Sequence, residues 1–301
     1  MKIKSTFMAP LLCVVVTLML AASHYLDLDR LALRSNASLA VIVLQLLIIV
    51  VPTVFYIKLR GEGFPARMRI APFGMEKLLV TLLAAVTLIL GDLLLKLALY
   101  RLGLTDGAYT VYDSYLEGRD PGLLYAIFTY CIVPSVAEEL LFRSVLCAEY
   151  EPNGVLTAVI GSSLLYGMFS MNFGYFAVYV LAGLIFALVL YLTRSVLASM
   201  LCHFIYSLFE MAASETLWKL ISKPQSTAFL IFAAAGLFLL CLVSLFSECE
   251  RIYGNYALQK KSSDYCKACP RFSPRLFAEA LLAPPYLVAG LVFIVAAIEF
   301  M

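Results

Sequence analysis

The sequence predicts an all-α protein, a polytopic transmembrane bundle of about eight to nine helices. Of its 301 residues, 63% are apolar and 14% are charged. Soluble domains carry roughly 45–50% apolar and about 25% charged residues. The apolar residues are also gathered into runs close to the ~20 residues that cross a bilayer. A soluble fold of this size could not bury so much hydrocarbon surface, so lipid is the expected solvent.

Nine apolar runs can be recognised along the chain. The fifth, sixth and seventh runs are short and nearly contiguous, so each can tilt, bend or cross only part of the bilayer. The predicted number of spans is therefore good to about one. The runs lie near 7–22, 37–57, 76–100, 122–147, 155–171, 173–192, 195–212, 226–246 and 279–299.

The distribution of Lys and Arg between alternate loops predicts the orientation. With a cytoplasmic amino terminus, the cytoplasmic segments hold 13 of these residues and the outer loops hold 6, leaving aside those within or at the ends of helices. Because basic loops stay in the cytoplasm, we expect the amino terminus inside and the carboxyl terminus outside. Residues 1–23, with two lysines, an apolar stretch and then Ala-Ala-Ser, also fit a cleaved signal peptide, and this alternative stays open.

The chain divides into three parts by its polar content. Residues 1–121 hold amino-terminal helices and loops, residues 122–212 form a core rich in buried polar groups, and residues 213–301 hold carboxyl-terminal helices. A basic cytoplasmic loop over 247–278 mixes six basic residues with aromatic ones, which is typical of contact with anionic lipid. The net charge of +2 gives no sign of a nucleic-acid partner, because the basic residues lie in short loops.

The eight cysteines do not predict a disulfide framework. Five of them lie in apolar runs, where a reduced thiol behaves as a small hydrophobe: Cys13, Cys131, Cys147, Cys202 and Cys241. Cys266 and Cys269 form a single CxxC in the basic loop. Without a second pair, incidental thiols are favoured over a metal site.

Placing a charged side chain at membrane depth costs free energy, so the charged residues within the apolar runs indicate a structural or functional role. Asp92 and Lys96 lie four residues apart in the third run, on one helix face and in the favourable acid-first order. They are expected to form a neutralised structural pair, with contact to a substrate or ion as the alternative.

The fourth run carries the densest charge, Glu138, Glu139 and Arg143, directly after Pro134. The proline is expected to kink this helix or to begin a new one. Glu139 and Arg143 share a helix face and can pair, whereas Glu138 points about 100° away without an in-helix cation. Two adjacent carboxylates in a dry site titrate as a coupled pair and suit general acid–base chemistry. The alternative is a salt bridge that joins two helices.

Two later runs carry polar stripes at helical spacing. In the fifth run the stripe consists of hydroxyl groups, which alone are ordinary helix-packing residues. In the seventh run His203, Ser207 and Glu210 share one face of an otherwise apolar helix. A stripe that includes a glutamate is expected to face a wet cavity. The hydroxyl stripe of the fifth run is Ser162, Tyr166 and Ser170.

These stretches resemble the CAAX-processing and bacteriocin-immunity (CPBP, or Abi) family of membrane-embedded endopeptidases. Glu138-Glu139-Leu-Leu-Phe-Arg143 matches the EExxxR signature of that family. The stretches 162–174 and 181–203 are similar to its second and third blocks, in the same order and in apolar context over roughly 120–210.

The resemblance implies a mechanism. Glu138 would act as general base on a water, which the histidine of the second block would help to hold. His203 and the asparagine four residues after it would stabilise the oxyanion. Glu139 and Arg143 would keep the site in shape.

Two positions depart from the pattern of that family. Ser170 stands where the second block has histidine, and Ser207 stands where the third block has asparagine. Losing one oxyanion donor costs on the order of 100–1000-fold in rate. Asn172 and Glu210 are the candidates for compensation. The usual route of the family is therefore compromised.

A catalytic metal and a cofactor are not expected. Relatives in this family are often labelled metalloproteases, and a catalytic zinc usually takes three protein ligands that include histidine. The chain has only His24 and His203. The two glutamates with His203 would make a weak site at most.

Three functions follow in order of preference. The first is an intramembrane endopeptidase in the bacterial plasma membrane, acting on a membrane-delivered peptide or lipid-modified peptide. The second is a family member that no longer cuts and instead binds a peptide or a membrane partner, in bacteriocin immunity, signalling or assembly. A transporter ranks last, because no pair of interrupted helices repeats across two halves.

Overall fold

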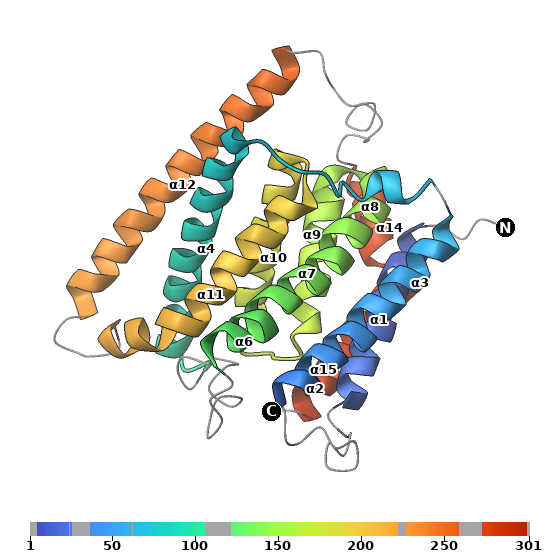
Figure 1. The fold of residues 1–301 in the computed structure, drawn as a ribbon, viewed down its shortest axis with the longest axis horizontal. Helices are drawn as coiled ribbons and strands as arrows, with labels where there is room; N and C mark the ends of the chain where they lie inside the picture. Colours follow the sequence, from blue (N-terminus) through green and yellow to red (C-terminus); the bar gives the residue numbers. More distant parts are fainter. Residues whose placement is uncertain are drawn as a thin grey trace.

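A computed structural model describes residues 5–23, 25, 37–61, 63–105, 122–221, 227–258 and 273–299. Every regular element in this part of the chain is a helix, which confirms the predicted class (Figure 1). The helices are α1 Ser5–Ser23, α2 Ala37–Gln45, the π-helix η1 Leu46–Val50, α3 Val51–Arg60, the 3₁₀ turn η2 Pro65–Arg67, α4 Met75–Arg101, α6 Leu123–Ile127, the π-helix η3 Phe128–Ile132, α7 Val133–Glu139, the π-helix η4 Leu140–Leu146, α8 Cys147–Tyr150, the 3₁₀ turn η5 Glu151–Asn153, α9 Val155–Phe169, α10 Phe176–Thr193, α11 Val196–Ile221, α12 Thr227–Leu258, α14 Pro274–Leu281 and α15 Pro284–Glu299.

Five helical stretches among the described residues are long and apolar enough to cross a membrane. A sixth arises if α14 and α15, which meet at a bend of 52°, form one broken span. Two further apolar helices, Phe7–Ser23 and Val155–Phe169, are shorter. The run near 122–147, which consists of α6, η3, α7 and η4, is not among these stretches. The chain is a polytopic membrane protein, and its described residues hold five to six candidate spans by length and composition.

The centre of the bundle is built around α10. This helix packs against α9 on one side and α4 on another, and α11 contacts both α4 and α10 (Figure 1). α1 packs along α15 at one edge of the molecule. At the other edge α12 packs against α4. Most of α12 is exposed, and only 11% of its most apolar stretch is buried inside the protein. The chemistry-bearing helices therefore lie in the middle of the bundle.

Polar contacts join several chain segments at one end of the bundle. Arg60 forms a bidentate pair with buried Glu149, with N–O distances of 2.5 and 2.8 Å. Arg69 lies 2.9 Å from Glu151. Lys77 donates to the carbonyl of Thr193 at 3.0 Å. The ends of α3, α8 and α10 and the beginning of α4 therefore share this end.

The opposite end gathers another set of helix termini. Tyr25, which follows α1, donates to Glu299 at the end of α15 over 3.1 Å. Tyr100 near the end of α4 lies edge-on to Trp218 of α11, with ring centroids 5.4 Å apart.

Pro134 marks a break in helical geometry, as predicted. It lies in the first turn of α7, directly after the π-helical turn Phe128–Ile132. Proline has no N–H to donate to the preceding turn, so the α-helical ladder cannot run through it. Ser135 donates its hydroxyl to the carbonyl of Cys131 at 2.5 Å and satisfies one carbonyl at the break.

Glycines allow α9 and α10 to approach closely. A Cβ at Gly183 would lie 2.9 Å from Ser163 Cα, and one at Gly167 would lie 2.5 Å from a methyl group of Val180. The backbone of α10 therefore reaches the residues that α9 and η4 contribute to the centre of the bundle.

Gly183→Ala should lower the melting temperature of the purified protein, because the new methyl group would push α10 away from α9. Overpacking of this kind typically costs about 1–3 kcal/mol. The matched control is Gly236→Ala on α12, where a Cβ meets nothing within 4 Å and the better helix propensity should stabilise by about 1 kcal/mol. Equal melting temperatures for the two variants would contradict a tight contact at Gly183.

Candidate active site

A cavity of about 220 Å³ opens among the central helices. It is lined by residues of α2, α4, α7, α9, α10 and α11, with Tyr130 from the π-helical turn before Pro134 and Tyr175 from the turn before α10. The lining residues are Val41, Gln45, Lys96, Tyr130, Pro134, Glu138, Tyr166, Tyr175, Val178, Tyr179, His203, Tyr206, Ser207 and Glu210.

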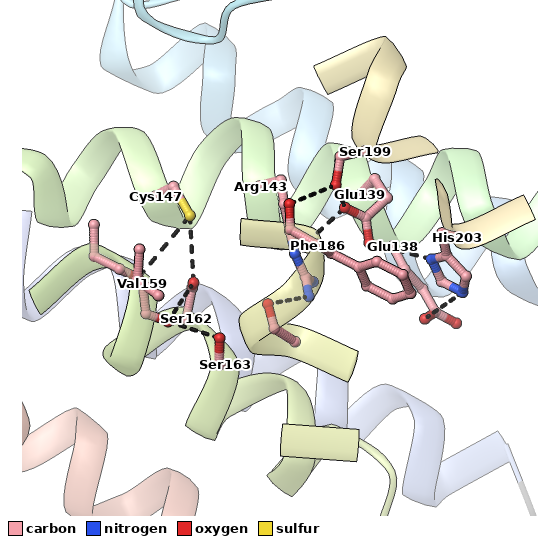
Figure 2. A network of polar contacts seen from close by, with 12 residues as sticks. Glu138, Glu139, Arg143, Cys147, Val159, Ser162, Ser163, Phe186, Ser199 and His203 are labelled. Atoms are coloured by element: carbon pink, nitrogen blue, oxygen red, sulfur yellow. Dashed lines mark hydrogen bonds and ion pairs between the residues drawn. The ribbon is translucent and has the colours of Figure 1, made fainter. Parts of the chain in front are cut away.

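Glu139 is the centre of a fully buried polar network beside this cavity (Figure 2). One carboxylate oxygen lies 3.1 Å from His203 Nδ1, and the other lies 3.3 Å from Arg143 Nε. Ser199 also donates its hydroxyl to Glu139. Arg143 comes from the same chain segment, whereas Ser199 and His203 come from α11. Glu139 therefore neutralises Arg143 and fixes the orientation of the imidazole.

Glu138, the adjacent residue, faces a different way. Its side chain retains 14% of its surface, against none for Glu139, and it lines the cavity. Its Oε2 lies 4.0 Å from His203 Nε2. Figure 2 shows the two side chains next to each other. The imidazole is thus placed between two carboxylates, one that holds it and one that shares the cavity with it.

The guanidinium of Arg143 is enclosed by aromatic rings. Its Cζ lies 4.6 Å from the ring centroid of Tyr166 and 5.2 Å from that of Phe186, and its Nη2 donates to the carbonyl of Gly183 at 3.1 Å. Aromatic faces attract cations most strongly where water is absent. The close approach of α10 at Gly183 brings that carbonyl within reach of the guanidinium.

The ring of His203 is stacked on Phe186, with centroids 4.6 Å apart and planes at 17°. Tyr166 meets the same imidazole edge-on at 6.3 Å. Together with the bond to Glu139, these contacts leave His203 little freedom to rotate. The Nε2 atom is therefore kept on the side of Glu138.

The structure brings together most of the site residues that the sequence predicted. Glu138, Glu139, Arg143 and His203 form one cluster, and Ser207 lies one helical turn along in the wall of the cavity.

Ser170 behaves differently from these residues. It ends α9, donates its hydroxyl to the carbonyl of Gly167 at 2.7 Å, and does not line the cavity. Asn172 accepts from the backbone of Tyr175 at 3.2 Å. Both side chains stabilise the end of α9 and the turn after it, so neither takes the place of the missing histidine in the cavity wall.

Sequence reasoning missed the role of Ser199 and of Phe186. Ser199 precedes His203 by four residues, so a helical projection would have placed both on one face of α11. No local spacing signals that Phe186, on another helix, stacks on the imidazole. Tyr166 was interpreted as a packing residue, and it lies in the cavity wall beside Glu138.

A second polar cluster lies at another part of the cavity wall. The predicted pair is confirmed, with Lys96 Nζ 2.9 Å from Asp92. The same ammonium lies 2.6 Å from Glu210 of α11, and Tyr206 donates to Asp92 at 3.0 Å. These cross-helix partners were not predicted.

The described residues do not offer a ligand set for a catalytic metal. No group of three His, Cys, Asp or Glu side chains is placed to share an ion in this part of the chain. Glu139 is engaged by Arg143 and Ser199, and one nitrogen of His203 is engaged by Glu139. Glu138 and Nε2 alone would give two ligands, and a catalytic zinc takes three. His24, Cys266 and Cys269 lie outside the described residues.

Comparison with known proteins identifies the central region. No curated protein and no solved structure matches the chain. A family model described as type II CAAX prenyl endopeptidase Rce1-like matches residues 120–209. The match contains both glutamates, His203 and Ser207. Residues 120–209 are therefore an Rce1-like domain of the CPBP and CAAX prenyl endopeptidase family.

Proposed function

We propose that the protein is an intramembrane endopeptidase in which Glu138 activates a water for attack on a peptide bond. One observation carries the proposal. Glu138 and His203 face each other in a cavity at 4.0 Å, while Glu139 binds the far nitrogen of the same imidazole. A water within hydrogen-bond reach of Glu138 and Nε2 would be positioned by both groups. The Rce1-like domain supports this chemistry.

The reaction can be followed through the residues of this chain. Glu138 takes a proton from the water as the oxygen attacks the scissile carbonyl, and later gives that proton to the leaving amine. Glu139 accepts from Nδ1 and fixes the orientation of the His203 ring, as a buried carboxylate does in a catalytic triad, and the step uses the ring with both nitrogens protonated. The Nε2–H then donates to the developing oxyanion, with the Ser207 hydroxyl as the second donor.

The second candidate function is binding of a peptide without cleavage, as in an immunity or scaffold protein. The observation that favours it is the side chain of Ser170, which bonds to its own helix instead of reaching the cavity. The cavity then lacks one of the groups that hold the water in this family. Cleavage is the preferred proposal because Glu138, Glu139 and His203 still lie together in one cluster at the cavity.

The substrate is proposed to be a peptide or lipid-modified peptide delivered through the membrane. The cavity lies among apolar helices, and Val41, Pro134 and Val178 give it apolar walls. Membrane lipids are the other partners.

The proposed topology has nine crossings with the amino terminus in the cytoplasm, in a bacterial plasma membrane. The ends of the second, fourth and sixth apolar runs share one end of the bundle, where Arg60, Arg69 and Lys77 form their polar contacts. The ends of the first and ninth runs meet at the opposite end, through Tyr25 and Glu299. Alternate crossings produce this arrangement, and the basic residues favour the cytoplasm for the first end.

Glu138→Gln should abolish peptide cleavage while leaving the protein folded, because the amide cannot accept the proton of the water. The measurement is mass spectrometry of a synthetic peptide library after incubation with the purified protein in lipid nanodiscs. Removal of a general base typically costs 10²–10⁴-fold.

Glu248→Gln on α12 is the control for Glu138→Gln, because this glutamate pairs with Arg251 on the exposed surface of that helix. Cleavage by Glu138→Gln at the wild-type rate would rule out Glu138 as the base. Binding of library peptides by the wild-type protein without products would favour the second candidate function.

Ser207→Asn should raise the rate of cleavage, because an amide N–H reaches further than a hydroxyl towards the oxyanion. The gain should appear in kcat and not in KM, and one added donor is worth up to about 100-fold. Ser170→Asn serves as the control, since that position lies outside the cavity wall. A rate unchanged by Ser207→Asn would show that Ser207 does not face the reacting carbonyl.

Reporter fusions should place consecutive turns on alternating sides of the membrane. Fusions ending at Gly154 and at Arg194 should give cytoplasmic fluorescence of green fluorescent protein, and a fusion ending at Gly174 should give external alkaline phosphatase activity. Gly154, Gly174 and Arg194 lie just before α9, just before α10 and just before α11. The same side for Gly154 and Gly174 would mean that α9 does not cross.

A further inference from the structure

One side chain in the cavity wall has a buried polar atom that no other described residue satisfies. The side chain is that of Gln45 at the end of α2. Its Oε1 is shielded from solvent and has no hydrogen-bond donor in the described part of the chain. Gln45 also directly precedes the π-helical turn η1, but its side chain makes no capping bond to that turn. The proposed reaction does not use this residue.

The local sequence turns Gln45 towards the cavity. Val41 and Gln45 lie four residues apart, so they share one face of α2, and both line the cavity. The next two residues, Leu46 and Leu47, are exposed. α2 packs against η3 and α7. The carboxamide of Gln45 therefore enters the cavity beside the segment that carries Glu138.

A carboxamide without a partner is unfavourable in such a place. Moving an amide from water into apolar surroundings costs free energy unless a new hydrogen bond forms. A buried acceptor that stays unpaired bears the full desolvation cost, whereas an apolar side chain of the same shape does not. Methionine at position 45 would therefore give a more stable protein. A residue that lowers stability in a cavity wall is typical of a site that a ligand satisfies.

The carboxamide matches the main chain of a peptide. Glutamine offers a carbonyl acceptor and an NH₂ donor side by side. The C=O and N–H groups of an extended peptide complement this pair, as they do between neighbouring β-strands. The N–H groups of a peptide that enters a bundle of apolar helices need such partners, because little water is present to bond them. Lys96 and Glu210 in the same cavity bond to each other, and His203 is held by Glu139.

We propose that Gln45 binds the main chain of the substrate, with Oε1 accepting a peptide N–H and the amide nitrogen donating to a neighbouring peptide carbonyl. This inference rests on the proposed function, since it places the peptide in the same cavity as Glu138. It names the substrate class as an extended peptide segment that is recognised through its backbone. Proline is disfavoured at the bound position, because it has no N–H.

The test replaces single amide bonds of a peptide by ester bonds, each of which removes one N–H. The probe is the library peptide that the wild-type protein in nanodiscs cleaves fastest, or the one that it binds most tightly if none is cleaved. Every bond except the scissile one is replaced in turn. One ester should raise KM, or Kd for a peptide that is not cleaved, by about fivefold, which is the contribution of one neutral hydrogen bond. For a cleaved peptide kcat should not change, because the bond is formed equally in the ground state and the transition state.

Gln45→Met should raise KM or Kd for the all-amide peptide by a similar factor. The ester that weakens binding to the wild-type protein should have no further effect in this variant, because both changes remove the same hydrogen bond. The melting temperature of the ligand-free variant should equal or exceed that of the wild-type protein, since methionine has a similar helix propensity and no amide to desolvate. Gln45→Leu takes its place if Gln45→Met does not fold.

Tyr150→Phe is the matched control for Gln45→Met. The hydroxyl of Tyr150 is also buried without a hydrogen-bond partner in the part of the chain that the structure describes, and Tyr150 does not line the cavity. Its removal is the same kind of change at a site away from the peptide. Tyr150→Phe should keep the wild-type KM or Kd and the wild-type response to each ester.

The outcomes separate this inference from the endopeptidase function. Cleavage in which no ester acts more strongly on the wild-type protein than on Gln45→Met overturns the role of Gln45 and leaves the reaction standing. A lower melting temperature of Gln45→Met with unchanged KM also overturns that role, because it shows that the glutamine only supports the fold. Binding that shows the ester effect without any products overturns the endopeptidase function and supports main-chain recognition by Gln45. A wild-type protein that neither cleaves nor binds any library peptide overturns both.

Discussion

The fully buried carboxylate of Glu139 is the group on which the site depends. It binds Arg143, His203 and Ser199 together, and so joins the helix after Pro134 to α11. A charge without water must be paired and hydrogen-bonded, or the fold loses several kcal/mol. Three partners meet that requirement here, which is why two adjacent glutamates can have different roles. Glu139 is fully engaged in ion pairs and hydrogen bonds with its neighbours, whereas Glu138 lines the cavity.

The backbone around the glutamates is adapted to this division. The π-helical turns Phe128–Ile132 and Leu140–Leu146 lie on either side of α7, where Glu138 and Glu139 end the α-helical segment. π-helical turns are rare and are frequent at functional sites. The wider turn of η4 begins between Glu139 and Arg143 and still leaves the two side chains close enough to pair.

Much of this architecture could be predicted from local patterns, and the rest could not. All nine apolar runs contain helices, and two pairs, Asp92 with Lys96 and Glu139 with Arg143, followed from a four-residue spacing. Glu210 lies 114 residues from Lys96, so their contact depends on how α4 and α11 pack. The orientation of Ser170 could not be predicted either, because a serine at the end of a helix can donate its hydroxyl to a backbone carbonyl of the preceding turn.

The length of α12 has a consequence for how the protein sits in a bilayer. Its 32 residues extend for about 48 Å, whereas the hydrocarbon core of a typical membrane is ~30 Å thick. Such a mismatch is relieved by tilting or by carrying the terminal turns among the headgroups. The pair of Glu248 and Arg251 lies towards the carboxyl-terminal end of α12, where it would lie among phosphates and water. The tilt of α12 relative to the membrane normal should therefore depend on the thickness of the surrounding bilayer.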